Sequence, residues 1–247
     1  MVAIAREAGA LIMHHYAGEV TRRDKADKSP VTVADEEAEK LIIARLYDAA
    51  AEIPVVAEES AAAGSLPNVS GGVFFLVDPL DGTKEFLNRN GEFTVNIALI
   101  EHGRPTAGVV LAPAVHRLFW GSGTKAFEEK TDTKHVTAIA TRPTPADGMV
   151  AIASRSHRDR LTDEYLTHYP IKEIVAAGSS LKFCVIAAGE ADIYPRHGAT
   201  MEWDTAAGHA VLLAAGGRVT RLDGKTPLTY GNAAEKFLNQ SFVAWGR

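Results

Sequence analysis

The stretch from Val73 to Thr83 constrains the fold of this 247-residue chain more than any other. Five consecutive large apolar residues begin at Val73, after two glycines, and end before Asp78-Pro79. A run without polar alternation is typical of a strand that is covered on both faces. Pro79 has no amide hydrogen to donate to a neighbouring strand, so we expect the strand to end there. The fold must therefore supply a layer on each side of this strand.

The turn after this strand carries two carboxylates, Asp78 and Asp81, with Gly82 beside them. Two unit charges about 4 Å apart repel by about 4 kcal/mol at an effective dielectric of about 20. A buried fold tolerates the pair if one carboxyl group is protonated or if a cation lies between them. The pattern thus indicates a Mg2+-type site with oxygen ligands. Asp, Pro and Gly are also favoured in ordinary turns, and this alternative stays open on these residues alone.

Composition narrows the class of protein. The formal net charge of -5 and the pI near 6.0 argue against a protein that binds nucleic acid polymers. The single cysteine, Cys184, rules out an internal disulfide and favours a cytoplasmic location, or a peripheral one at the inner face of the membrane. Arg6 and Glu7 interrupt the N-terminal apolar stretch, so we expect no signal peptide. No apolar run approaches the roughly 18 residues of a transmembrane segment. The sequence leaves the oligomeric state open.

Apolar spacing predicts a mixture of helices and strands. It predicts helices over 4–16 and 32–51, and strands over 53–57, 73–77, 93–100, 108–111 and 117–120. The polar segment 131–148 suggests a boundary between an N-terminal α+β half, 1–145, and a C-terminal α/β half, 146–247. In the second half we expect strands at 149–153, 171–176 and 191–194, with helices at 159–168, 181–188 and 203–215.

Four polar segments each have two interpretations. Asp35, three residues after Thr32, has the spacing of a capping box, or it belongs to a metal site. The segment Gly178-Ser179-Ser180 is an ordinary helix start, or it offers amide and hydroxyl groups to a phosphate. Asp204 lies near a helix start, where an acid is favourable without any further role. The basic segment 21–30 is a solvated loop, or a cationic flap over an anionic site.

Three acidic blocks together point to a family. They are, in chain order, Glu58-Glu59-Ser60, Asp78-Pro79-Leu80-Asp81-Gly82-Thr83 and Trp203-Asp204-Thr205-Ala206-Ala207-Gly208. With these blocks the chain resembles the inositol monophosphatase superfamily, whose members are Mg2+-dependent and often lithium-sensitive phosphatases of layered α/β fold. Within it, the chain is similar to the CysQ-type 3'(2'),5'-bisphosphate nucleotidases, through Lys84-Glu85-Phe86, Ser154-Arg155-Ser156-His157 and the segment 178–184. Inositol monophosphatases usually have Thr-Asn or a similar pair in place of Lys84-Glu85.

The resemblance implies metal ligands and catalytic residues. Two to three Mg2+ ions would be held by the carboxylates of Glu58, Asp78, Asp81 and Asp204 and by the Leu80 carbonyl, with Asp78 as the bridge. Asp35 and Thr83 would position or activate the attacking water, and Glu58 joins them as a catalytic residue. These residue types suit the chemistry, because Mg2+ prefers oxygen ligands and two ions can clamp the attacking and leaving oxygens.

The resemblance also suggests the substrate. The reaction would remove the 3'-phosphate of adenosine 3',5'-bisphosphate to leave AMP, and so clear a by-product of sulfate assimilation. The second phosphate needs further contacts, and the candidates are Lys84, Ser154, Arg155, Ser156, His157, Ser179 and Lys182. Gly82, Thr83 and Asp204 are expected to bind the substrate as well. One rival is an inositol or sugar monophosphatase with the same metals. Another is a catalytically silent nucleotide-binding sensor, which Mg2+-dependent phosphate release would exclude.

Overall fold

Strand β4 (Val73–Asp81) lies in the interior of a large sheet, as its unbroken apolar run predicted. The structure is a computed structural model that describes residues 1–18, 22–24, 30–154 and 159–247. Within these residues the large sheet has seven strands, in the spatial order β3 (Val55–Ala57), β4, β5 (Thr94–Glu101), β6 (Arg104–Ala112), β7 (Arg117–Ser122), β8 (Lys125–Lys130) and β9 (His135–Ile139). Strand β3 runs parallel to β4, and each later pair is antiparallel.

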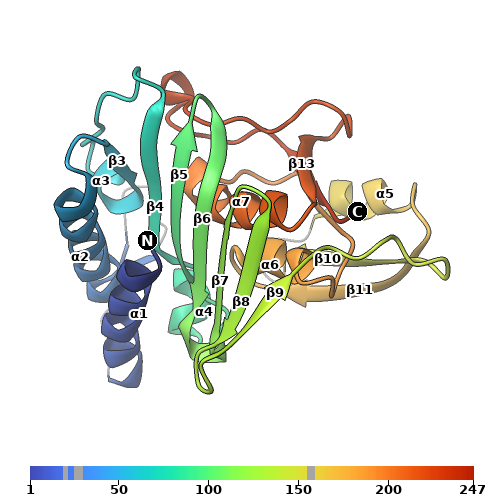
Figure 1. Cartoon of the computed structure of the whole chain (residues 1–247), viewed down its shortest axis with the longest axis horizontal. Coiled ribbons are helices and arrows are strands. Elements are labelled where there is room, and N and C mark those ends of the chain that lie inside the picture. Colours follow the sequence, from blue (N-terminus) through green and yellow to red (C-terminus); the bar gives the residue numbers. More distant parts are fainter. Residues whose placement is uncertain (19–21, 25–29, 155–158) are drawn as a thin grey trace.

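Alternate side chains of β4 enter two different cores. Phe75 and Val77 belong to the core formed with helices α1 (Val2–Ala17) and α2 (Val33–Ala50). Phe74 and Leu76 belong to the core on the other face, with helices α6 (Leu181–Ala187) and α7 (Ala206–Ala214). Figure 1 shows these helix pairs on opposite sides of the sheet. Both faces of β4 are therefore covered, which accounts for its lack of polar alternation.

Helix α7 lies against the backbone of the large sheet. Gly108 of β6 permits this approach, since a Cβ atom at this position would stand 2.4 Å from the carbonyl oxygen of Ala207. The close packing brings the segment before α7, which carries Asp204, up to strands β4 and β5. A glycine on one element thus helps to position an acid on another.

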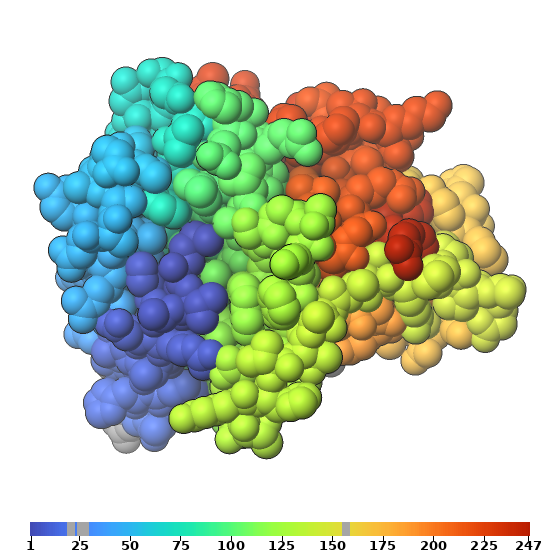
Figure 2. All heavy atoms as spheres, viewed as in Figure 1, coloured from blue at the N-terminus to red at the C-terminus, as the bar shows by residue number. Residues whose placement is uncertain are grey.

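A smaller sheet follows in the C-terminal half. In the described part of the chain its order is β11 (Ile171–Ala177), β10 (Met149–Ser154), β12 (Ile193–Arg196), β14 (Phe242–Trp245) and β13 (Arg218–Arg221). Strand β10 is parallel to β11 and β12, whereas β14 is antiparallel to both its neighbours. Its inner face packs on α6 and α7, and its outer face contacts helix α5 (Arg160–Leu166). Figure 2 shows the two halves in continuous contact.

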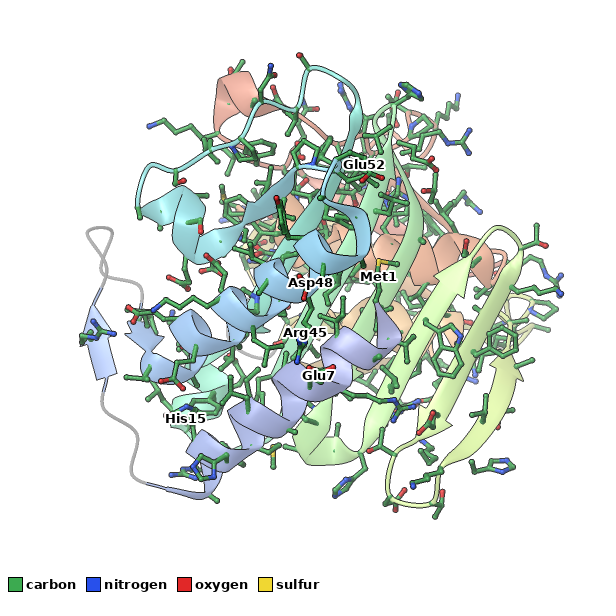
Figure 3. All side chains as sticks on the ribbon, turned by 60° about the vertical axis from the view of Figure 1, so that its left-hand side comes forward. Met1, Glu7, His15, Arg45, Asp48 and Glu52 are labelled. Atoms are coloured by element: carbon green, nitrogen blue, oxygen red, sulfur yellow. The ribbon has the colours of Figure 1, made fainter. Side chains whose placement is uncertain are left out.

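The remaining short elements connect these layers. Strands β1 (Arg22–Asp24) and β2 (Pro30–Thr32) form an antiparallel pair that leads into α2. The others are α3 (Glu58–Ala62), α4 (Thr83–Leu87) and the 3-10 turns η1 (Pro113–Val115), η2 (Glu202–Asp204) and η3 (Ala233–Glu235). On the outer surface Arg45 of α2 donates a hydrogen bond of 2.8 Å to Glu7 of α1 (Figure 3). Among the described helices, none combines the length and apolar character needed to cross a membrane.

The layered α/β fold is confirmed, and two of the predicted boundaries are wrong. Strand β4 does not end at Pro79. A bulge between Asp78 and Asp81 leaves Pro79, which has no amide hydrogen, out of the pairing with β5, and pairing resumes at Asp81. The helix expected over 203–215 is split at Thr205 into η2 and α7. Strands β1, β2, β8, β9, β13 and β14 were not predicted, and β1 and β2 fall where a polar loop was expected. The division at residue 145 stays a prediction.

Candidate active site

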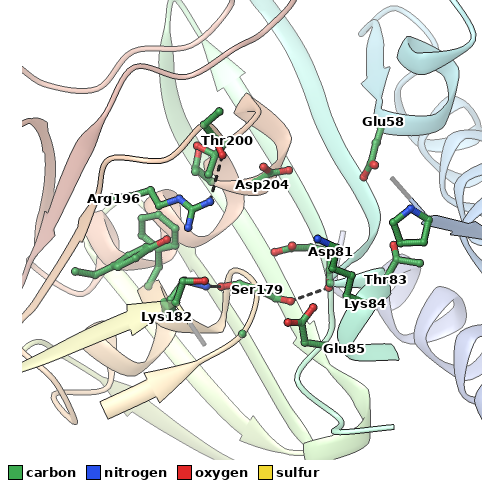
Figure 4. Close-up of a pocket in the computed structure, with 18 residues that line it drawn as sticks. Glu58, Asp81, Thr83, Lys84, Glu85, Ser179, Lys182, Arg196, Thr200 and Asp204 are labelled. Carbon is green, nitrogen blue, oxygen red and sulfur yellow. Dashed lines mark hydrogen bonds between the residues drawn. The ribbon is translucent and has the colours of Figure 1, made fainter. Parts of the chain in front are cut away.

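A cavity of about 300 Å3 opens where the acidic turn of β4 meets the C-terminal half. Figure 4 shows the side chains that line it, with the acids on one side and two cations on the other. The lining residues come from separate elements, and they include Glu58, Asp81, Gly82, Thr83, Lys84, Glu85, Ser154, Ser179, Lys182, Arg196, Thr200 and Asp204. The structure thus brings most of the predicted site residues to one cavity.

The acidic turn is held by its own backbone and by α6. Asp78 is 1% exposed, and its Oδ1 accepts a hydrogen bond of 3.0 Å from the Leu80 amide. The Asp81 carboxylate accepts one of 2.6 Å from the Ser180 amide. Gly82 has φ of +93°, and a Cβ atom there would lie 2.3 Å from Ser179 Oγ, so a glycine is required. The turn is buried and bonded to the segment before α6, unlike an ordinary surface turn.

Asp35 makes the capping contact that its spacing predicted and also contacts a cavity residue, while its role at a metal site stays a prediction. Its Oδ2 accepts hydrogen bonds from the Thr32 amide at 2.8 Å and the Thr32 hydroxyl at 2.6 Å, at the start of α2. Its Oδ1 accepts a hydrogen bond of 3.0 Å from the hydroxyl of Thr83. Because the Thr83 hydroxyl donates its hydrogen to Asp35, the lone pairs of Thr83 Oγ1 can accept a hydrogen bond from a water molecule in the cavity. Asp35 therefore caps a helix and orients a cavity residue at the same time.

Asp204 reaches the cavity from η2. Its Oδ2 accepts a hydrogen bond of 2.7 Å from the Met201 amide, and its backbone carbonyl accepts one of 2.5 Å from the Ser180 hydroxyl. Ser180 thus contacts Asp81 through its amide and Asp204 through its hydroxyl. The start of α6 joins the two acids across the interface between the halves.

The acids of the site interact strongly. Burial raises the pKa of Asp78 well above its usual range, and the charges of Glu58, Asp81 and Asp204 raise it further. Burial likewise raises the pKa of Asp204 well above its usual range, with contributions from Asp81 and Glu58. Burial raises the pKa of Asp81 to about 6, against a lowering effect of Lys182. Each acid is thus destabilised in its charged form by the others, which a bound cation would relieve.

The donor set fits Mg2+ in its chemistry. Carboxylate and carbonyl oxygens are the ligands that this hard cation prefers. In the described part of the chain, no three His, Cys, Asp or Glu side chains already stand in an arrangement that holds a metal ion. Glu58, Asp78, Leu80, Asp81 and Asp204 as ligands stay predictions.

Two buried cations face the acids. Lys182 is 5% exposed and donates a hydrogen bond of 2.6 Å to the Ser179 carbonyl, and burial lowers its pKa to about 8. Arg196, at the end of β12, is 9% exposed and donates to the carbonyls of Gly198 and Ala199 at 3.1 and 3.2 Å. Sequence reasoning missed Arg196, although a cation that closes an apolar strand was a usable signal. Buried cations at a cavity wall suit an anionic ligand.

The other predicted phosphate contacts have mixed outcomes. Lys84 and Ser154 line the cavity. Ser179 also lines it, but its hydroxyl lies 2.8 Å from the carbonyl oxygens of Asp81 and Glu92 and donates to the backbone. The amide of Ser180, the residue before α6, was a candidate phosphate contact, but it donates to the Asp81 carboxylate instead. Arg155, Ser156 and His157 lie outside the described residues, as does most of the loop 21–30, so their roles stay predictions.

Comparison with known proteins agrees with this site. Residues 1–243 match the model of the inositol monophosphatase family. The chain is 44% identical over 241 residues to the 3'(2'),5'-bisphosphate nucleotidase CysQ of Escherichia coli K12, over 97% of this chain and 95% of that protein. A crystal structure of CysQ from Bacteroides thetaiotaomicron aligns with a TM-score of 0.82 at 35% identity, over 98% of this chain and 94% of that one. The Thermotoga maritima IMPase aligns with a TM-score of 0.79 at 25% identity, over 99% and 89%. The chain belongs to the inositol monophosphatase family.

Proposed function

We propose that this protein is a Mg2+-dependent 3'(2'),5'-bisphosphate nucleotidase, which removes the 3'-phosphate of adenosine 3',5'-bisphosphate and leaves AMP. The observation that carries the proposal is one cavity with buried, mutually repelling carboxylates on one wall and two buried cations, Lys182 and Arg196, on the other. A metal-bound phosphate accounts for the acids, and a second anionic group on the same substrate accounts for the cations. The CysQ relatives support this substrate class.

The acids would hold two to three Mg2+ ions through Glu58, Asp78, Asp81, Asp204 and the Leu80 carbonyl. The bound ions would offset the negative charge of the phosphate and make a water molecule a better nucleophile. Thr83 accepts a hydrogen bond from that water, while its own hydrogen stays on Asp35. The water oxygen forms the new bond to phosphorus, the bond from phosphorus to the ribose oxygen breaks, and that oxygen takes up a proton.

The cations would bind the second phosphate. Lys182 and Arg196 are buried at the wall that faces Asp81 and Asp204, so a phosphate there replaces lost hydration for both. A monophosphorylated inositol has no second anion for this wall, which favours a bisphosphonucleotide over the inositol substrate. The proposed location is the cytoplasm, in keeping with the buried, unpaired Cys184.

The first test measures phosphate release from adenosine 3',5'-bisphosphate with Mg2+ and with EDTA, and identifies the nucleotide product. Release of AMP only with Mg2+ is the expected result. Inositol 1-phosphate serves as the competing substrate in the same assay. A higher kcat/KM for the inositol ester would overturn the nucleotide assignment, and absence of turnover with both would leave a binding protein without catalysis.

The second test uses Lys182→Met to measure how much the wall with Lys182 and Arg196 contributes to binding of the second phosphate. A lost charge-assisted hydrogen bond of about 1.5–3 kcal/mol should lower kcat/KM for the bisphosphate by about 10- to 100-fold. The matched control is 3'-AMP, which lacks the second phosphate. Because any effect of the substitution on Asp81 acts on both substrates, the ratio of the two kcat/KM values is the readout. An unchanged ratio would contradict a phosphate contact at Lys182.

A further inference from the structure

Glu39 of α2 makes a set of contacts that no part of the proposed reaction uses. Its side chain is only 4% exposed. Its Oε2 accepts a hydrogen bond of 2.7 Å from the Glu59 amide, and its Oε1 accepts bonds of 2.8 and 2.5 Å from the amide and the hydroxyl of Ser60. This buried carboxylate therefore accepts all of these hydrogen bonds from the first turn of α3, the helix that begins at Glu58.

Helix α3 is too short to be stable by itself. It is five residues long, and none of its residues is fully buried. Among its side chains, Ala61 packs partly against the core. The amides of its first turn have no partner inside the helix, and a carboxylate satisfies them well. The contact with Glu39 therefore helps to set the direction in which Glu58 leaves the backbone.

Helix α2 carries both Asp35 and Glu39, and each of them binds a segment that lines the cavity. Asp35 binds the hydroxyl of Thr83, and Glu39, one turn later, binds the start of α3. Residues four apart lie on the same face of a helix, so one rigid element fixes the acidic turn and the Glu58 helix relative to each other. The core residues Ala38, Ile42 and Leu46 anchor α2 itself.

We propose that Glu39 is a positioning residue that sets the Mg2+ affinity of the site by fixing the backbone from which Glu58 projects. The inference rests on the proposed function, since it takes Glu58 as a metal ligand. Glu39 does not line the cavity itself. It acts through the two amides and the hydroxyl that it accepts from, and its carboxylate is not a ligand. Groups that orient a metal ligand in this way affect metal binding at a distance from the ion.

The experiment compares Glu39→Gln with Glu129→Gln. The side-chain amide of glutamine has a donor NH2 group in place of one accepting carboxylate oxygen. In Glu39→Gln this NH2 group would face one of the α3 backbone amides, which is also a donor, and that hydrogen bond would be lost. Glu129 is a matched control, because it is 5% exposed, lies on β8 and pairs with Arg6 away from the cavity. Three quantities are measured for each protein: Mg2+ binding by calorimetry without substrate, kcat at saturating Mg2+, and the melting temperature in EDTA.

We expect Glu39→Gln to raise the Mg2+ dissociation constant by about tenfold or more, while saturating Mg2+ restores much of kcat. Glu129→Gln should melt earlier without a change in Mg2+ binding. If Glu39→Gln is folded and binds Mg2+ as the wild type does, the inference is wrong. A wild-type protein that binds no Mg2+ would instead overturn the proposed function, and the inference with it.

A second variant decides the matter if Glu39→Gln does not fold. Ser60→Ala removes one of the three donors to Glu39 and leaves both amides in place. We expect a smaller rise in the Mg2+ dissociation constant in the same direction. Unchanged Mg2+ binding in Ser60→Ala, beside an unfolded Glu39→Gln, would mean that Glu39 serves stability alone and would overturn the inference.

Discussion

Removal of the Asp81 charge should stabilise the metal-free protein, although it removes a residue of the site. Burial raises the pKa of Asp81 from 3.8 to about 6. The native state therefore holds its proton more tightly than the unfolded chain, so the native state loses stability as the pH rises from about 4 to above 6. This rise in the pKa of Asp81 corresponds to about 3 kcal/mol of stability, at about 1.36 kcal/mol per pH unit.

Asp81→Asn removes this penalty and keeps an oxygen that can accept from the Ser180 amide. In EDTA at pH 8 the variant should exceed the wild type in free energy of unfolding by up to about 3 kcal/mol. The measured gain falls below this limit, because Lys182 loses one of its nearby anions. Below about pH 4 both side chains are neutral, and the difference should vanish.

Urea unfolding followed by tryptophan fluorescence measures this difference across the pH range. Mg2+ added at 1,000 times its dissociation constant should reverse the order, since it stabilises the wild type by about 4.1 kcal/mol and the variant binds it poorly. A wild type that is as stable as Asp81→Asn in EDTA at pH 8 would refute the claim that burial penalises the charge of Asp81 in the metal-free protein.

Two further substitutions test single contacts. Asp35→Asn should cost about 1 kcal/mol of stability through the cap on Thr32, and it should also lower turnover because Thr83 loses its orienting partner; urea unfolding and phosphate release measure the two effects, and unchanged turnover would leave only the cap. Burial lowers the pKa of His209 to about 3, so only the unfolded chain takes up this proton below pH 6.5, and stability should fall by about 1.4 kcal/mol per pH unit on acidification. His209→Gln should lack this contribution in unfolding curves between pH 4 and 7, and an identical pH dependence in both proteins would contradict it.

Local patterns predicted the elements whose cause is local. The unbroken apolar run of β4 predicted a strand covered on both faces, because each alternate side chain needs its own core. Asp35 was placed at a helix start by its spacing from Thr32, and the cap is present. Strand β8 was not predicted because charged residues dominate its sequence. Strand β9 was not predicted because it is exposed along its length, so no alternation of apolar and polar residues marks it.

The site shows the same division. The acids of the cavity stand in compact blocks of sequence, so their types and order alone pointed to an oxygen-ligand site and to a family. Lys182 and Arg196 lie on different elements, and only the packing of β12 against α6 places both at one wall. Glu39 was passed over because it looks like any surface acid of an amphipathic helix.

The sequence by itself determined which chemistry this protein can perform, since residue type decides ligand and charge. The tertiary structure decided which polar groups form hydrogen bonds within the protein and which face the cavity. Ser179 and Ser180 have the composition of a phosphate site, yet they bind the protein's own carbonyls and the Asp81 carboxylate. The physical reason is that a hydrogen bond depends on distance and direction between segments far apart in the chain, and these are set only when the layers pack.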